Sequence, residues 1–255
     1  MLSDEDLYVF DTTGFLVVRG AFDADEVRRF RAELDELSAT EPYANTERFD
    51  DLTAHSPTFG KLALDDRVVG RARDVINQPM RLLEAYALRR QRHSALYLHG
   101  GYAELLDMPD RTVGRDLSIM HTYHDGRIYC TYVKALIYLS AIRTQEDGSF
   151  CYLHGSHKAN FPLLRARARR GERRSLIDEG FPTLADVFVE AGDLLLLNEA
   201  LMHGTRRKLS DGDRTLLAFS YGPTFLVDWR ELDGETADLR GQGYVDHDVE
   251  EDFVR

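Results

Sequence analysis

The apolar residues of this chain change their spacing near Arg81, and this change constrains the fold most strongly. Before Arg81 they recur at helical spacing, whereas after it they form short runs between turn residues, which is typical of strands. Seven runs are seen, at residues 82–88, 95–98, 128–139, 149–153, 187–189, 194–197 and 216–221. Helices followed by this many strands predict an α+β fold, a double-sheet jelly roll or cupin-like barrel with helices against one side.

The region before Arg81 predicts helices that each bury one face. A short helix begins near Leu7, and a turn at Gly14 leads into a strand over 15–18. Asp23 is placed to cap the next helix, whose apolar residues are spaced three and four apart. A further helix is predicted over 59–76. We expect these helices to pack on a sheet.

The domain organisation follows from length and composition. A chain of 255 residues is long enough for one domain with a sizeable core, and no long linker or internal repeat divides it. We predict one domain over 1–255. It would consist of a mostly helical part over 1–80, a jelly-roll core over 81–225 and a C-terminal extension over 226–255.

Charge and cysteine content exclude several classes of function. The net charge of −12 argues against binding a nucleic-acid polymer, which needs a surplus of Lys and Arg. The acidic N-terminus does not resemble a signal peptide, and no 18 consecutive residues are apolar, so we expect no membrane span. Cys130 and Cys151 lie in strand-like segments and predict core thiols in a reducing compartment. A cytoplasmic enzyme acting on a small molecule is therefore favoured.

Two histidines and one arginine follow or precede strand-like runs and are the first candidate site residues. His203 comes after the run 194–197, and Arg214 starts the run that contains 216–221. His99 ends the run 95–98 in the same way and is followed by two glycines. Antiparallel strands could carry His203 and Arg214 to one pocket, a metal ligand beside a receptor for a carboxylate. Taken singly, each also fits a structural histidine or a surface arginine.

Three segments together resemble the phytanoyl-CoA dioxygenase family of iron(II)/2-oxoglutarate-dependent enzymes. They are Phe10–Val18, Gly148–Lys158 and Gly192–Arg214, and they occur in the family's order over most of the chain. The resemblance implies a double-stranded β-helix, which is the jelly roll predicted above, and an enzyme that uses Fe(II), 2-oxoglutarate and O2. It implies that His203 is the distal iron ligand, that Arg214 holds the far carboxylate of 2-oxoglutarate, and that Thr205 assists in cofactor binding.

The sequence departs from the family pattern at the first iron ligands. The family supplies them as His-x-Asp, but no His-x-Asp or His-x-Glu occurs here. By context His99 takes the histidine position, so Gly101 stands where the carboxylate is expected. One hypothesis is that Gly101 leaves room for chloride, as in the iron/2-oxoglutarate halogenases, whose His-x-Gly motif it resembles. This halogenase hypothesis, with His99 and His203 as the protein ligands, is the preferred one.

Two more hypotheses are compatible with the sequence. In the hydroxylase hypothesis, the carboxylate comes from elsewhere in the chain and the enzyme is an ordinary hydroxylase. Its candidate carboxylates are Asp107, Asp116, Asp125 and Glu199. In the binding-module hypothesis, the metal has been lost and the barrel only binds a small molecule.

A different metal site could be built from His121, His124 and Asp125. These residues are close in sequence, but they lie in a predicted turn, where we expect them to line a loop over the pocket. His154 and His157 belong to a Gly-Ser-His turn and are predicted to be structural.

The substrate is the feature that the sequence constrains least. Two groups of arginines predict either a solvated, charge-balanced surface or an entrance for an anionic metabolite, such as a nucleotide or an amino acid. They are Arg89, Arg90 and Arg92, and Arg165, Arg167, Arg169, Arg170, Arg173 and Arg174. Flat faces for a ring could come from Tyr97, Tyr102, Tyr123 and Trp229. Nothing in the sequence predicts the oligomeric state.

Overall fold

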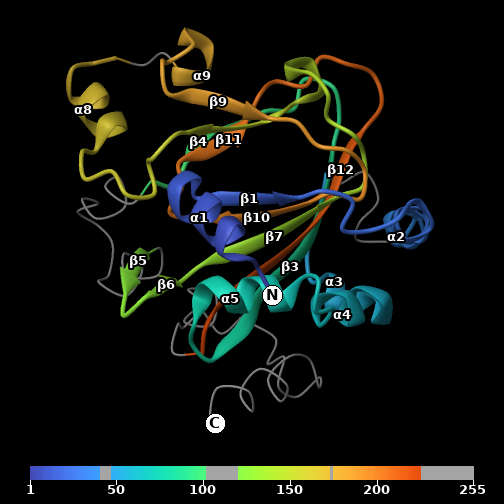
Figure 1. Ribbon diagram of the computed structural model, residues 1–255. Coiled ribbons are helices and arrows are strands. Elements are labelled where there is room, and N and C mark those ends of the chain that lie inside the picture. The colour runs from blue at the N-terminus through green and yellow to red at the C-terminus, as the bar shows by residue number, and fades with distance from the viewer. Residues whose placement is uncertain (41–46, 102–119, 173–174, 225–255) are drawn as a thin grey trace, which may run out of the picture.

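The computed structural model describes residues 1–40, 47–101, 120–172 and 175–224, and two facing antiparallel sheets dominate it (Figure 1). The larger sheet has the order β1 (Phe15–Val18), β10 (Leu194–Asn198), β7 (Val133–Tyr138), β12 (Arg214–Pro223), β3 (Met80–Arg90) and β2 (Arg48–Phe49). The smaller sheet has the order β4 (Leu96–His99), β11 (His203–Thr205), β8 (Phe150–Leu153) and β9 (Leu184–Val187). The predicted jelly roll is therefore confirmed.

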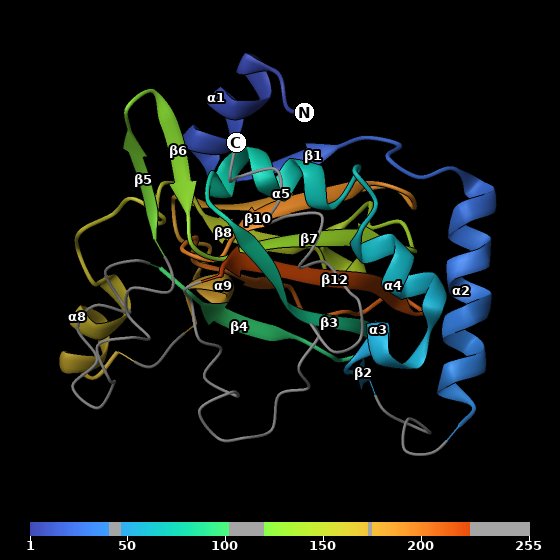
Figure 2. The ribbon, with the colours of Figure 1, turned by 90° about the horizontal axis from the view of Figure 1, so that it is seen from below.

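Helices from the first part of the chain cover the outer face of the larger sheet, as predicted (Figure 2). They are α1 (Asp4–Thr13), α2 (Ala24–Ser38), α3 (Leu52–His55), α4 (Pro57–Ala63) and α5 (Val69–Ile76). Helix α2 begins where expected, because Asp23 accepts the N–H groups of Asp25 and Glu26 while Glu26 bonds back to Asp23. The apolar faces of these helices form one core with the outward residues of the sheet.

A second apolar core fills the space between the two sheets. Tyr86, Leu136 and Leu216 reach it from the larger sheet, and Phe150 and Val187 reach it from the smaller one. The outer face of the smaller sheet is covered by α8 (Leu163–Arg169) and α9 (Leu176–Glu179), and a short 3-10 helix, η1 (Gln145–Asp147), precedes β8. Both faces of each sheet are therefore at least partly covered by apolar packing.

Several predicted elements differ in their boundaries. The helix expected over 59–76 is divided into α4 and α5, because the Asp65 carboxylate accepts the backbone N–H of Arg67 and so competes with the helical hydrogen bonds. The strand expected over 128–139 is two strands: β6 (Arg127–Cys130) pairs with β5 (His121–His124) in a separate hairpin, and β7 joins the larger sheet.

The relation of His203 to Arg214 also differs from the prediction. His203 lies on its own short strand, β11, and Arg214 begins β12 in the opposite sheet. The two residues therefore lie in different sheets and are not neighbours in one hairpin. The reason is that the chain changes sheets after β10, at the turn over residues 199–202.

A search of the described residues finds no helix with the length and apolar character needed to cross a membrane. Residues 226–255, predicted as a C-terminal extension, lie outside the described part of the chain. Both cysteines are buried and free, and burial raises the pKa of each thiol, which agrees with the prediction of core thiols.

Candidate iron site

His99 and His203 lie opposite each other on the neighbouring strands β4 and β11. Their ring centroids are 4.2 Å apart. In each case Nδ1 donates a hydrogen bond to the backbone carbonyl two residues earlier, at 3.1 Å to Tyr97 and 2.7 Å to Leu201. A carbonyl can only accept, so Nδ1 carries the proton and Nε2 keeps its lone pair. Both rings are thus in the tautomer that binds a metal through Nε2.

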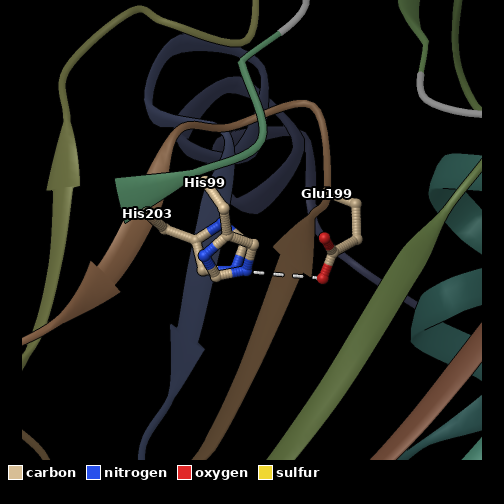
Figure 3. Close-up of side chains that lie close together, drawn as sticks. All are labelled: His99, Glu199 and His203. Atoms are coloured by element: carbon tan, nitrogen blue, oxygen red, sulfur yellow. Dashed lines mark ion pairs between the residues drawn. The ribbon is translucent and has the colours of Figure 1, made fainter. Parts of the chain in front are cut away.

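Glu199 brings a carboxylate to the same place from the turn that follows β10. Its Oε1 is 3.9 Å from Nε2 of His203, and the ligand atoms of His99, Glu199 and His203 all lie within 4.8 Å of one another. Figure 3 shows the two rings and the carboxylate converging from two sides of the barrel. Among the described residues, this is the one group of three or more metal-binding side chains.

The charges around this cluster suit a cation. Burial lowers the pKa of His203 to about 4, so its ring is neutral at physiological pH. Burial alone would raise the pKa of Glu199, but the charges of Lys134, His203 and His99 outweigh it and lower that pKa to about 2. The cluster therefore offers the neutral imidazole of His203 and the ionised carboxylate of Glu199, which are the forms that bind a metal.

The Glu199 oxygen that faces the histidines still has acceptor capacity. The Lys134 ammonium is 2.6 Å from Oε1, yet Oε1 is buried without a hydrogen bond of good geometry. Two imidazoles and one carboxylate on one side of a metal form the arrangement used by non-haem iron(II) oxygenases. The residues present therefore fit an iron ion.

Arg214 lies buried at the start of β12, with Tyr138 of β7 beside it. Its guanidinium carbon is 5.9 Å from the centre of the Tyr138 ring. Arg214 Nε and the Tyr138 hydroxyl are both buried, and neither has a hydrogen-bond partner among the described residues. Unpaired buried donors are costly, so these two groups are suited to receive a ligand such as a carboxylate.

A model of the phytanoyl-CoA dioxygenase (PhyH) family matches residues 10–216. The chain belongs to this family. It is accordingly an iron(II)/2-oxoglutarate-dependent dioxygenase, and the expectation of an enzyme that uses iron and 2-oxoglutarate is confirmed at that level.

Solved structures of HygX from Streptomyces hygroscopicus are similar over almost the whole chain. The structure with nickel and 2-oxoglutarate bound is 68% identical, covers 99% of each chain and has a TM-score of 0.85. The structure with nickel, 2-oxoglutarate and hygromycin B bound has a TM-score of 0.82 and covers 99% of this chain and 98% of that one. A curated ectoine dioxygenase of Nocardia farcinica is 23% identical over an alignment 239 positions long, which covers 83% of this chain and 74% of that protein.

Both glycines after His99 have a backbone conformation with positive φ, which favours glycine. Gly100 has φ of 78°, and a Cβ at this position would come within 2.6 Å of the Leu201 carbonyl oxygen and 2.9 Å of that of Glu199. Gly101 has φ of 88° and donates its N–H to the carbonyl of Ala200 at 3.1 Å. The glycines therefore let the end of β4 pass closely over the turn that carries Glu199. The positive φ of Gly101 accounts for a glycine at this position without a bound halide.

The alternative metal site is not assembled in the structure. The His121 ring is held by Asp11 at 2.7 Å on Nε2 and by Asn198 at 2.7 Å on Nδ1. His124 and Asp125 are exposed at the end of the β5–β6 hairpin, away from His121. Asp107 and Asp116, which were also candidate carboxylates, lie outside the described residues.

His157 and Thr205 have structural contacts. His157 is buried and bonded to the carbonyl of Asp11 at 3.0 Å, as expected for a structural residue, whereas His154 is exposed. The Thr205 hydroxyl accepts the N–H of Leu96 at 3.0 Å and so holds β4 to β11 at a bulge. In the described structure, Thr205 therefore supports β4, the strand that carries His99.

The arginines that suggested an anionic substrate are paired with carboxylates. The pairs are Arg89–Asp35, Arg90–Glu47, Arg92–Asp211, Arg167–Glu179 and Arg170–Glu172. Arg165 and Arg169 also have partners, and Arg173 and Arg174 lie outside the described residues. These pairs agree with the charge-balanced surface that the sequence also allowed.

Sequence reasoning missed the part played by Lys134 and Tyr138, and it named Glu199 only as one of four carboxylates. Glu199 precedes His203 by four residues in a chain that has just left a buried strand. This closeness in sequence to the candidate ligand His203 was the signal that could have identified Glu199 as the carboxylate. Of the aromatic residues proposed for a substrate ring, Tyr97 and Tyr123 are exposed, and Tyr102 and Trp229 lie outside the described residues.

Proposed function

We propose that this dioxygenase holds iron(II) through His99, Glu199 and His203, binds 2-oxoglutarate through Arg214, and oxidises an amino sugar. The observation that carries the proposal is that the metal-binding atoms of His99, Glu199 and His203 all lie within 4.8 Å of one another. Three protein ligands would hold the metal and would leave coordination positions for the co-substrates. When bound, the iron and 2-oxoglutarate supply the oxidising chemistry that activates a C–H bond.

The chain's own residues prepare this site. The backbone carbonyls behind His99 and His203 fix both rings with Nε2 inward, which a metal ligand requires. Arg214 supplies a buried guanidinium to the far carboxylate of 2-oxoglutarate, and the Tyr138 hydroxyl beside it is a further donor. The Phe150 ring stacks on His203, with centroids 5.4 Å apart, and limits water around the ligand.

Oxygenation fits these residues better than chlorination. The halogenase hypothesis depended on a missing carboxylate, because chloride needs the place that a third protein ligand would take. Glu199 offers that carboxylate, Gly100 is explained by close backbone packing, and Gly101 by its positive φ. We therefore favour the hydroxylase hypothesis, in which the carboxylate comes from elsewhere in the chain.

The substrate proposal rests on the relative that shares 68% identity and has been solved with hygromycin B bound. Hygromycin B is an aminoglycoside, so it carries amino groups and hydroxyls. The net charge of −12 favours a cationic substrate over an anionic one, and arginines such as Arg90 and Arg167 are already paired with carboxylates. An aminoglycoside or its cationic precursor replaces the anionic metabolite as the proposed substrate class.

Product analysis tests the proposal. The purified chain is incubated with iron(II), 2-oxoglutarate, chloride and hygromycin B or a related aminoglycoside, and the products are followed by mass spectrometry. We expect oxidised product, with one oxygen gained or two hydrogens lost, together with consumption of 2-oxoglutarate. A chlorine isotope doublet in the product would support the halogenase hypothesis and contradict ours.

A further inference from the structure

A buried lysine lies directly behind the carboxylate of the iron site. Lys134 is on β7, next to β10, and its ammonium is 2.6 Å from Oε1 of Glu199. The side chains are only 15% and 8% exposed. Buried lysines are rare without a charge partner, because removing an ammonium from water is costly. The Lys134 ammonium therefore depends on the Glu199 carboxylate to compensate its charge in the folded chain.

A second carboxylate and two aromatic rings also lie near the Lys134 ammonium. Glu84 Oε2 is 4.0 Å from its ammonium and also accepts a hydrogen bond from the Tyr132 hydroxyl at 2.8 Å. The ring centres of Tyr86 and Tyr132 lie 5.8 and 5.5 Å from the same nitrogen. These contacts fix the lysine on the inner face of the larger sheet.

The ammonium and an iron ion would act on the same oxygen. Glu199 Oε1 lies 2.6 Å from the Lys134 ammonium and 3.9 Å from Nε2 of His203. Without the lysine, an ionised Glu199 in the metal-free protein would be a buried charge with no cation in contact. Breaking one partner of a buried pair is strongly destabilising for this reason.

We propose that Lys134 is a positioning residue that compensates Glu199 and keeps its carboxylate directed at His99 and His203 while the iron site is empty. The inference rests on the proposed function, in which Glu199 is an iron ligand. Lys134 and the metal then both compensate the negative charge of Glu199. Removal of the lysine makes the empty site less stable, and bound metal stabilises the altered chain more than the native one.

Thermal unfolding with and without nickel(II) tests this role. The metal-free Lys134→Met variant should melt roughly 5–15 °C below the native chain, as expected for a broken buried pair in a chain of this size. Saturating nickel(II) should raise its melting temperature by more than it raises that of the native chain. Lys61→Met, which removes an exposed lysine on α4, is the control and should melt like the native chain in both states.

The Glu199→Gln variant separates the two proposals. It should lose the nickel-induced shift, and a full shift in this variant would contradict Glu199 as a ligand. If Glu199→Gln loses the shift but Lys134→Met melts and responds to nickel like the native chain, only the role of Lys134 is wrong. A smaller nickel response in Lys134→Met than in the native chain would also overturn that role.

The double variant Lys134→Met with Glu199→Gln covers the case in which the single lysine variant does not fold. It contains no unpaired buried charge, so it should melt above Lys134→Met or fold where that variant fails. A double variant that is no more stable than Lys134→Met would show that the lysine does not act through Glu199, and would overturn the inference.

Discussion

At the scale of single residues, the backbone decides which ring nitrogens can bind metal. Because Nδ1 of His99 and of His203 donates to a carbonyl, Nε2 of each ring is left as an acceptor. Their replacement by alanine should abolish nickel(II) or iron(II) binding, measured by titration of the metal-free chain. His124→Ala is the control, since His124 is exposed on the β5–β6 hairpin and should keep full affinity. Loss of binding in His124→Ala, with retention in His99→Ala, would place the metal elsewhere.

Arg214 should determine the affinity for 2-oxoglutarate. Arg214→Leu leaves one carboxylate of the co-substrate without its partner in a buried setting, a loss of roughly 2–5 kcal/mol. The apparent affinity for 2-oxoglutarate should fall at least tenfold, while metal binding in its absence stays near native. Arg92→Leu removes an exposed arginine that pairs with Asp211 and provides the matched control. Equal affinities in the two variants would show that 2-oxoglutarate is held by different groups.

The sequence predicted part of this site from residue type and position. His99, His203 and Arg214 were named as candidates because each adjoins an apolar run, and this pattern is visible in the sequence alone. The choice of Glu199 could not be made, because it depends on how the turn after β10 crosses under the end of β4. The role of Lys134 could not be predicted for a similar reason. The sequence does not indicate which carboxylate will pair with a buried lysine on a strand.

At the scale of elements, the crossing of β4 over the 199–202 turn is the contact that joins the two sheets at the site. Gly100→Ala should damage it, because the added Cβ meets the carbonyl oxygens of Leu201 and Glu199 and the backbone has a positive φ. Gly126→Ala is a matched control in the β5–β6 hairpin, with the same φ of 78° and open space around the added carbon.

Denaturant unfolding of these two variants separates backbone strain from the clash. Gly126→Ala should cost about 1 kcal/mol through φ alone, whereas Gly100→Ala should cost about 3 kcal/mol or more and weaken nickel binding as well. Equal losses would show that the close approach at Gly100 relaxes without consequence.

Element types were predicted better than element partners. The capping residues of α2 and the apolar run of β10 were read correctly, since both signals are local. The division of 59–76 into two helices depends on a side-chain bond from Asp65, and the transfer of the chain from β10 to β11 depends on the opposite sheet. Such features are set by tertiary contacts, which periodicity does not record.

At the scale of the whole molecule, buried histidines should make the metal-free protein sensitive to acid. Burial lowers the pKa of both His157 and His203 to about 4, below the usual 6.5. The unfolded chain therefore binds these protons first, so the stability is complete above about pH 6.5 and is lost as the pH falls toward 4.

For one such histidine, the free energy of unfolding should fall by roughly 2 kcal/mol between pH 7.5 and pH 5. His157→Gln, whose amide can still donate to the Asp11 carbonyl, should reduce the pH dependence without removing that bond. Urea unfolding at the two pH values measures the difference. An unchanged pH dependence in His157→Gln would mean that His157 is not held neutral by the fold.

The assignment of Glu199 as the carboxylate ligand is tested most directly by anaerobic titration of the metal-free chain with iron(II) and 2-oxoglutarate. The iron chelate of a 2-oxo acid gives a weak visible absorption band, which reports a correctly assembled site. We predict the band in the native chain and in Asp125→Ala, an exposed-carboxylate control, and its loss or a shift to at least tenfold higher iron concentration in Glu199→Ala. A native band in Glu199→Ala at the same iron concentration would contradict the assignment.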